Sequence, residues 1–151
     1  MIKEDYVSFE TAKLLKEKGF DADTEHNMWY VVEKFSTGCH WNSCTYKVGD
    51  ITREYDEKCC IVMPTLQMVM KWLREVHSCY IVTYWEFKNY DENGNPVFKD
   101  IIWSYNIAIP KYNSARRGDG DYFDIESEKE DYTTYEEVCE AAIKYCLENL
   151  I

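Results

Sequence analysis

The chain has 151 residues, a length that suits one domain able to bury roughly two-thirds of the surface that its unfolded form exposes. Hydrophobic residues make up 46% of it and aromatic residues 16%, which excludes an intrinsically disordered chain. The 17 basic residues face 28 acidic ones, and a net charge of −11 would repel a phosphate backbone, so we expect no nucleic-acid partner. No apolar run reaches the roughly 20 residues that cross a bilayer, and the polar N-terminal segment does not resemble a signal peptide. We therefore expect a folded cytoplasmic protein without a membrane partner.

A segment expected to form a helix lies near the start of the chain, from Ser8 to Gly19. Ser8 suits the N-cap, and Gly19 suits the left-handed position that follows a helix end. Phe20 can then fold back on Leu15 as the hydrophobic contact of this C-terminal cap.

The segment from residue 27 to residue 35 is rich in β-branched and aromatic residues and predicts a strand. Residues 45–48 can pair with it across a loop at residues 36–44. The polar segment 50–58 fits either an edge strand or an ordered loop.

A second helix is predicted from Pro64 to His77. Pro64 suits the first helical position, where its missing N–H costs nothing. Apolar residues recur at helical spacing, and the methionines among them fit a buried stripe or, alternatively, an adaptable groove for a partner. The stripe consists of Leu66, Val69, Met70, Leu73 and Val76.

Residues 79–88 and 97–109 flank a turn-forming sequence and predict a long antiparallel hairpin. Asn93-Gly94 suits a two-residue type I′ turn. That turn would place Tyr80, Val82 and Tyr84 of the first strand on the core face, opposite Ile107, Tyr105 and Trp103. The other face, which includes Trp85, would be half apolar and either covered by a helix or open for binding.

The rest of the chain predicts a long loop at residues 111–131, with a short strand at 122–125, and then a helix. Thr134 and Glu137 have the spacing of a capping box. On this last helix Cys139 and Cys146 lie seven residues apart, as buried side chains do. The seven cysteines are an odd number in a chain without an export signal, so we expect free thiols.

Negative charge is concentrated between residues 119 and 140, where ten acids accompany Lys129 alone. A solvated loop followed by the start of a helix explains this segment. An alternative is a surface that imitates a nucleic-acid duplex and competes for a nucleic-acid-binding protein. The acids are Asp119, Asp121, Asp124, Glu126, Glu128, Glu130, Asp131, Glu136, Glu137 and Glu140.

Four residues, Cys39, His40, Cys44 and Cys59, supply soft ligands of the kind that zinc prefers. Their spacing does not match the close pairs of structural zinc sites, so free or buried thiols are the preferred interpretation and no metal is expected. The sequence from Asp91 to Asn95 resembles the start of a calcium loop but lacks its later glycine and glutamate, which favours a hairpin turn. No cofactor is expected.

Catalytic signatures are not evident in this sequence. There is no nucleophile elbow, no glycine-rich phosphate loop and no paired histidine motif for zinc, so we expect a protein that is not an enzyme. The adjacent Arg116 and Arg117 could bind a small anionic ligand such as a nucleotide, with Trp85 and Trp41 stacking on its base. The simpler interpretation is that these arginines neutralise nearby carboxylates.

Three segments together resemble a family of small proteins of unassigned function from gut Bacteroidales and their tailed phages. They are YVSFETAKLLKEKGFD, PTLQMVMKWLREVH and TYEEVCEAAIKYCLENLI, and all three coincide with predicted helices. The resemblance implies a common framework and a phage or prophage accessory gene acting in the bacterial cytoplasm. It supplies no catalytic residue.

From these observations we predict a single α+β domain over residues 1–151, in which an antiparallel sheet with a long central hairpin packs against about three helices. For function we favour a non-enzymatic phage accessory protein that binds a host protein and interferes with it. The alternative is a protein that sequesters a nucleotide-like ligand, and a metal-binding or cysteine-dependent enzyme ranks third. We also expect that an uncovered hairpin face can support a homodimer.

Overall fold

The structure, a computed structural model, divides into two compact units, residues 1–69 and 70–151. Within the described residues each unit has a three-stranded antiparallel sheet, and helices accompany both, which confirms the α+β fold class. That the whole chain forms one domain stays a prediction. The structure describes residues 5–21, 26–35, 38–47, 60–99, 101–110, 122–127 and 131–151.

The first unit is built on the sheet of β1 (His26–Phe35), β2 (Gly38–Lys47) and β3 (Cys60–Met63), in the order β2-β1-β3. The pairing of β1 with β2 runs from His26 and Lys47 to Phe35 and Gly38. Our expectation of a loop at residues 36–44 was therefore wrong for residues 38–44, which belong to β2. Glycine, serine and asparagine have a low strand propensity, and the backbone pairing to β1 overrides it here.

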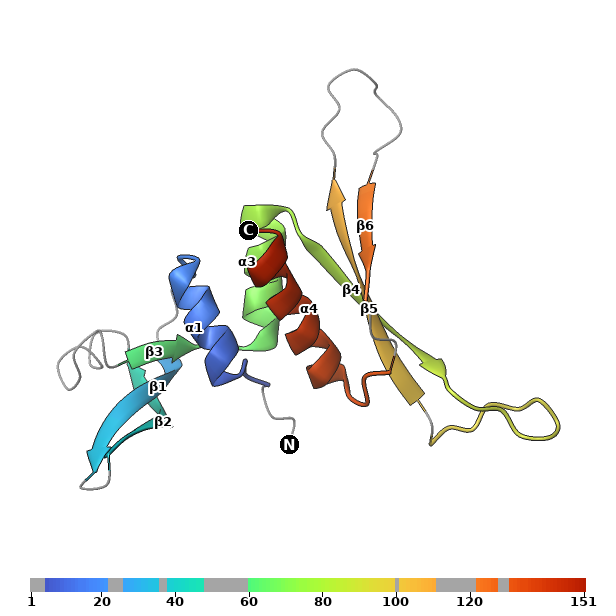
Figure 1. Cartoon of the computed structure of the whole chain (residues 1–151), viewed down its shortest axis with the longest axis horizontal. Coiled ribbons are helices and arrows are strands. Elements are labelled where there is room, and N and C mark those ends of the chain that lie inside the picture. Colours follow the sequence, from blue (N-terminus) through green and yellow to red (C-terminus); the bar gives the residue numbers. More distant parts are fainter. Residues whose placement is uncertain are drawn as a thin grey trace, which may run out of the picture. The chain divides into compact units, whose positions relative to one another are not determined.

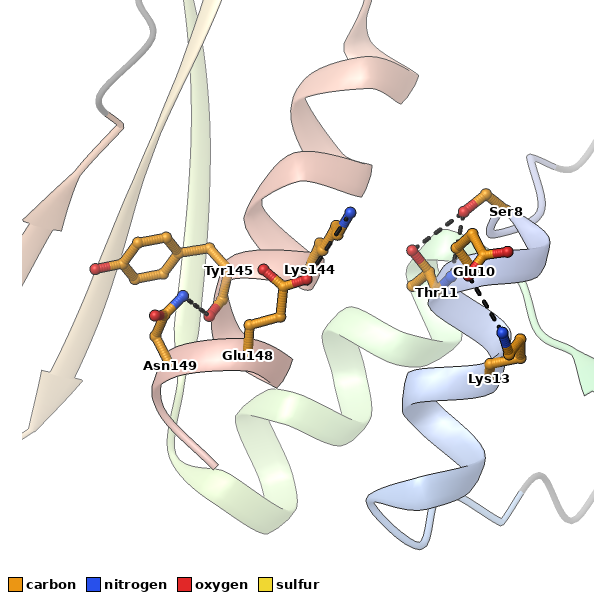
Figure 2. A network of polar contacts seen from close by, with 8 residues as sticks. All are labelled: Ser8, Glu10, Thr11, Lys13, Lys144, Tyr145, Glu148 and Asn149. Atoms are coloured by element: carbon orange, nitrogen blue, oxygen red, sulfur yellow. Dashed lines mark hydrogen bonds and ion pairs between the residues drawn. The ribbon is translucent and has the colours of Figure 1, made fainter.

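Helix α1 (Phe9–Glu17) is capped at both ends as the sequence predicted. The Ser8 hydroxyl oxygen accepts a hydrogen bond from the Thr11 backbone N–H at 3.3 Å (Figure 2). Gly19 has a φ of 78°, and its N–H donates to the Lys16 carbonyl at 3.2 Å. The Phe20 N–H donates to the Leu15 carbonyl at 2.9 Å, which completes a Schellman motif.

Contacts between described residues join α1, and the residues before it, to the first sheet. The Lys16 ammonium donates to the Cys60 carbonyl of β3 at 3.0 Å, and the Tyr30 hydroxyl of β1 donates to the Val7 carbonyl at 2.9 Å. The rings of Phe9 and Tyr30 meet edge to face with centroids 5.3 Å apart. These contacts hold α1 against the sheet of its own unit.

Helix α3 (Leu66–His77) begins two residues later than predicted. Thr65 is the N-cap, because its hydroxyl oxygen accepts from the Met68 N–H at 3.2 Å. Pro64 therefore precedes the cap and is not the first helical residue; its carbonyl accepts from the Val7 N–H at 3.0 Å. Leu66, Val69 and Leu73 of the predicted stripe are buried, whereas Val76 is 62% exposed, so the stripe ends one turn early.

The second unit contains the sheet of β4 (Tyr80–Phe87), β5 (Ile101–Pro110) and β6 (Tyr122–Glu126), in the order β4-β5-β6 (Figure 1). Helix α4 (Tyr135–Asn149) contacts β5 and β4. The short strand predicted at residues 122–125 is thus confirmed. Buried apolar side chains of this unit are Leu73, Cys79, Tyr105, Ile107, Val138, Cys139, Ala142, Ile143, Cys146 and Leu147.

A modified capping box begins α4. The Thr134 hydroxyl oxygen accepts from the Glu137 N–H at 3.1 Å, as predicted. The Glu137 carboxylate reaches back one residue further than expected, to the N–H and the hydroxyl of Thr133 at 3.0 and 2.7 Å. Near the other end, the Asn149 amide donates to the Tyr145 carbonyl, and an exposed Lys144–Glu148 ion pair lies alongside (Figure 2).

The register of the β4–β5 hairpin differs from our prediction by one residue. Thr83, not Val82, lies opposite Tyr105, and Trp85, not Tyr84, lies opposite Trp103. A shift of one residue exchanges the two faces of a strand, so the prediction for β5 is correct and the prediction for β4 is inverted. The loop causes this difference. Asp91 pairs with Asn95, so the loop contains three residues and not two. Between this turn and the first regular pair, Phe87 with Ile101, the second strand also contains two more residues than the first.

No helix in the described part of the chain is both long and apolar enough to cross a membrane.

Candidate functional site

Exposed large apolar side chains of the described residues are confined to one segment, from Val76 to Phe98, which consists of the end of α3, β4 and the hairpin loop. Because an exposed apolar patch costs solubility, a clustering of this kind marks an interaction site more often than scattered residues do. The side chains are Val76, Tyr80, Val82, Tyr84, Trp85, Tyr90 and Phe98.

The sheet of the second unit has one covered and one open face. The rings of Trp103 on β5 and Tyr135 on α4 meet edge to face at 5.4 Å, so α4 covers the face that carries Trp103, Tyr105 and Ile107. Side chains alternate along a strand, and the opposite face therefore carries a row of β4 residues that are 41–55% exposed. We call this row, Tyr80, Val82 and Tyr84, the open face of β4.

A second group of aromatic residues lies near the loop of the hairpin. This end of the hairpin extends beyond α4 (Figure 1). The Phe87 ring meets those of Phe98 and Trp85 edge to face, at 5.2 and 5.3 Å between centroids, and that of Tyr90 at 6.5 Å. Trp85 is 52% exposed, Tyr90 62% and Phe98 75%. We call these four residues the aromatic cluster; Phe87 organises it and the other three remain available for contacts.

The turn beyond the aromatic cluster is held by one carboxylate. The Asp91 side chain accepts from the backbone N–H groups of Asn93 and Asn95 at 2.9 and 2.8 Å, and from the Asn95 side-chain amide at 3.1 Å. These bonds, chiefly those from Asn95, hold the pKa of Asp91 below its ordinary value. Gly94 has a φ of 80°, the left-handed conformation that a three-residue hairpin loop requires. The loop is therefore ordered by its own hydrogen bonds.

Two polar atoms lie beneath the open face. The Ser104 hydroxyl and the Asn106 side-chain oxygen on β5 are buried, with no hydrogen-bond partner among the described residues. Ser104 is opposite Tyr84 and Asn106 is opposite Val82, so both lie directly beside the open face of β4. Such unsatisfied atoms reduce stability, and a structure selected only for stability would replace them with apolar groups.

The buried thiols of the second unit are unsuited to nucleophilic chemistry. Burial raises the pKa of Cys79, and burial together with the neighbouring Cys79 raises the pKa of Cys146 to about 12. A reactive cysteine needs a lowered pKa and access to substrate. Cys79 and Cys146 have neither, and the prediction that Cys139 and Cys146 are buried is confirmed.

The predicted zinc ligands are only partly described. The backbones of Cys39, His40 and Cys44 lie in β2, opposite Lys34, Glu33 and Trp29, and Cys59 falls outside the described residues. The side chains of the three β2 residues are likewise outside what the structure describes. Among the residues that were placed, no group of three His, Cys, Asp or Glu side chains could hold a metal ion.

The residues predicted to bind an anion are also described only in part. Arg116 and Arg117 lie outside the described residues, and only the backbone of Trp41 is described, in β2 opposite Val32. Trp85 is the one predicted binding residue with a described side chain, and it lies in the aromatic cluster. The nucleotide hypothesis therefore stays a prediction.

The acidic segment is described only in part, because Asp119, Asp121, Glu128 and Glu130 lie outside the described residues. Asp124 and Glu126 lie in β6, while Glu136 and Glu137 lie in the first turn of α4, where the helix dipole favours negative charge. Part of the acidic segment is thus explained by helix stabilisation, which weakens the interpretation as an imitation of nucleic acid.

Tyr90 and Phe98 are the site residues that we did not identify from the sequence. Both flank the turn, outside the regular strand pairing that our register considered. Large aromatic residues directly beside a polar turn are the signal that could have indicated this cluster.

Comparison of the chain with protein-family models, with curated proteins and with solved structures gives no match.

Proposed function

We propose that this protein is a non-enzymatic binding protein that contacts another protein through the aromatic cluster. The observation that carries the proposal is that, among the residues whose side chains the structure describes, the exposed large apolar ones are confined to the segment from Val76 to Phe98. Aromatic side chains dominate the energetics of protein interfaces because they bury a large area at a small cost in conformational entropy.

The geometry of the cluster supports a protein partner over a small ligand. Trp85, Tyr90 and Phe98 are 52–75% exposed around Phe87, whereas small-molecule sites are enclosed and bury most of their ligand. The Asp91 turn orders the loop beforehand, which lowers the entropic cost of binding. The partner in this proposal is a host protein of the bacterial cytoplasm, the setting that the family resemblance implies.

A test uses the double variant Tyr90→Ser with Phe98→Ser. Both side chains are more than half exposed, so their removal should leave the fold intact. We expect that wild-type protein immobilised on a support retains a specific partner from Bacteroidales lysate, and that the double variant retains it at least about tenfold less, a loss of roughly 1.4 kcal/mol or more.

The matched control is Val76→Ser, which removes an equally exposed apolar side chain outside the cluster. It should retain the partner at the wild-type level. Partner recovery that is the same for the wild type and for the double variant would refute the role of the cluster. Binding of the purified pair, measured by calorimetry, then gives the affinity of each variant directly.

A further inference from the structure

The outer edge of β4 has no backbone partner among the described residues. The hydrogen bonds of β5 show which backbone groups of β4 point outward. The Trp103 N–H donates to the Tyr132 carbonyl, and the Tyr105 carbonyl accepts from the Ser127 N–H. Odd-numbered residues of β5 therefore direct their backbone groups away from β4, and even-numbered residues bond to β4. On β4 the even-numbered residues are bonded, and the N–H and C=O groups of Ile81, Thr83, Trp85 and Phe87 point outward.

This edge also lacks the features that protect sheet edges from association. Natural edge strands are short, or they carry charges, prolines or bulges. Within its eight residues β4 has one charged side chain, Glu86, and no proline. The other edge strand of the same sheet, β6, is five residues long and carries Asp124 and Glu126. The two edges of one sheet thus differ: β6 is protected and β4 is not.

We propose that β4 pairs with β4 of a second copy of this chain, in antiparallel orientation about a two-fold axis at Thr83, to form a continuous six-stranded sheet. Outward-pointing residues must face outward-pointing residues, which restricts the register to odd residues opposite odd residues. With Thr83 opposite Thr83 of the second copy, Ile81 lies opposite Trp85, Val82 opposite Tyr84, and Tyr80 opposite Glu86.

The sequence of β4 is complementary to itself in this register. Aromatic residues lie opposite β-branched residues, which are favourable cross-strand pairs, and threonine lies opposite threonine. Each Glu86 is opposite a tyrosine, so no two like charges are opposed. A basic peptide would instead need an acidic strand to select it, and β4 supplies a single carboxylate.

The exposed area agrees with a modest dimer interface. Since a fully exposed aromatic side chain presents roughly 200 Å², the exposed fractions of Tyr80 (42%), Tyr84 (41%) and Trp85 (52%) correspond to roughly 250–300 Å² in each copy. Edge pairing covers the flanks of these side chains and not their whole exposed surface. Twice this area, with the contribution of Val82, is therefore an upper limit on the apolar area buried, which corresponds to a small interface of the kind that weak, transient complexes have. Because the symmetric contact occupies the outer edge of β4 in both copies, the assembly closes at two copies.

The test is the concentration dependence of the molar mass, measured by sedimentation of the full chain from about 1 µM to about 300 µM. We expect the wild type to change from monomer to dimer within this range. Thr83→Pro removes an outward N–H, which an edge strand tolerates in the monomer, and should raise the dissociation constant roughly tenfold or more. Thr83→Val is the matched control: it keeps the N–H and the branched shape, and should dimerise as the wild type does.

A second variant covers the case in which proline disturbs the strand. Val82→Glu changes a side chain that is 55% exposed, so the monomer should fold normally, as circular dichroism will show. In the dimer it brings two carboxylates near the two-fold axis and should also raise the dissociation constant roughly tenfold. A wild type that stays monomeric throughout the range, or a dimer that Thr83→Pro and Val82→Glu leave unchanged, would overturn the proposal. The dimer contact uses Trp85 of the aromatic cluster but neither Tyr90 nor Phe98, so Tyr90→Ser with Phe98→Ser should dimerise normally.

Discussion

The adjacent strands β4 and β5 have similar apolar and aromatic sequences and very different environments. In β5, Tyr105 is 4% exposed and Ile107 is fully buried, because the strand lies between β4 and β6 and under α4. In β4, Val82 and Trp85 are more than half exposed, and the strand has a described partner on one side only. Burial in this sheet therefore follows the position of the strand and not its composition. The apolar side chains of β4 that the fold does not bury remain available for binding.

The sharpest test of this difference uses two isoleucines that lie directly opposite each other, Ile107 on β5 and Ile81 on β4. Ile107→Ala should lower the free energy of unfolding by about 2–5 kcal/mol, because it leaves a cavity at a fully buried position. Ile81→Ala removes the same atoms from a partly exposed position and should cost clearly less. Denaturant unfolding, followed by tryptophan fluorescence and circular dichroism, measures both.

Equal losses for the two variants would break the comparison, since they would show that β4 is as deeply packed as β5. Each unfolding curve should be recorded at one low protein concentration. Dimerisation would otherwise add to the apparent stability of whichever variant retains it.

The helices were predictable from the sequence because their signals are local. Ser8 and Gly19 define the ends of α1 through contacts within a few residues, and Thr134 does the same for α4. The start of α3 was missed because Pro64 can either begin a helix or precede its cap, and the choice depends on its pairing with Val7, far away in the sequence.

The hairpin shows why the site itself was less predictable. Asn93-Gly94 correctly indicated a turn, but the loop length fixes the register, and a one-residue change exchanged the faces of β4. β5 was assigned correctly because Tyr105 and Ile107 alternate with smaller or polar residues. In β4 nearly every residue is apolar or aromatic, so no alternation of polar and apolar residues identifies the face that packs on the core. Only the structure shows that Val82 is exposed.

A second prediction concerns how well the side of the sheet under α4 is closed to solvent. Cys146 on α4 has a pKa of about 12, raised first by burial, against 9.0 in an exposed thiol. Below pH 9 the thiol is protonated in both states. Between pH 9 and about 12 the unfolded chain loses the proton and the folded chain keeps it, so the free energy of unfolding should fall by up to about 1.4 kcal/mol per pH unit.

This decline is measured by denaturant unfolding at several pH values between 8 and 11. Cys146→Ala should reduce the slope, because the titrating group is gone. Val138→Ala is the control: it removes atoms from an equally buried position on the same helix but no proton, and should lower stability without changing the slope. A slope that Cys146→Ala leaves unaltered would mean that the thiol reaches solvent.

The smallest expected effect is at the turn that joins the two strands. Asp91 is exposed, and its carboxylate accepts hydrogen bonds from the N–H groups of Asn93 and Asn95, which lower its pKa. Any stability that this carboxylate contributes is therefore present at neutral pH and is lost as the pH falls through the lowered pKa. Asp91→Ala should accelerate hydrogen exchange of these two amides while the Ile107 amide in β5 stays protected, and Asp91→Asn, which keeps an acceptor oxygen, should change exchange less. If the Ile107 amide also loses protection, the turn and the core unfold together. The aromatic cluster is attached to the turn, whereas the core lies under α4. If the turn is ordered by its own hydrogen bonds, its amides should exchange independently of the Ile107 amide.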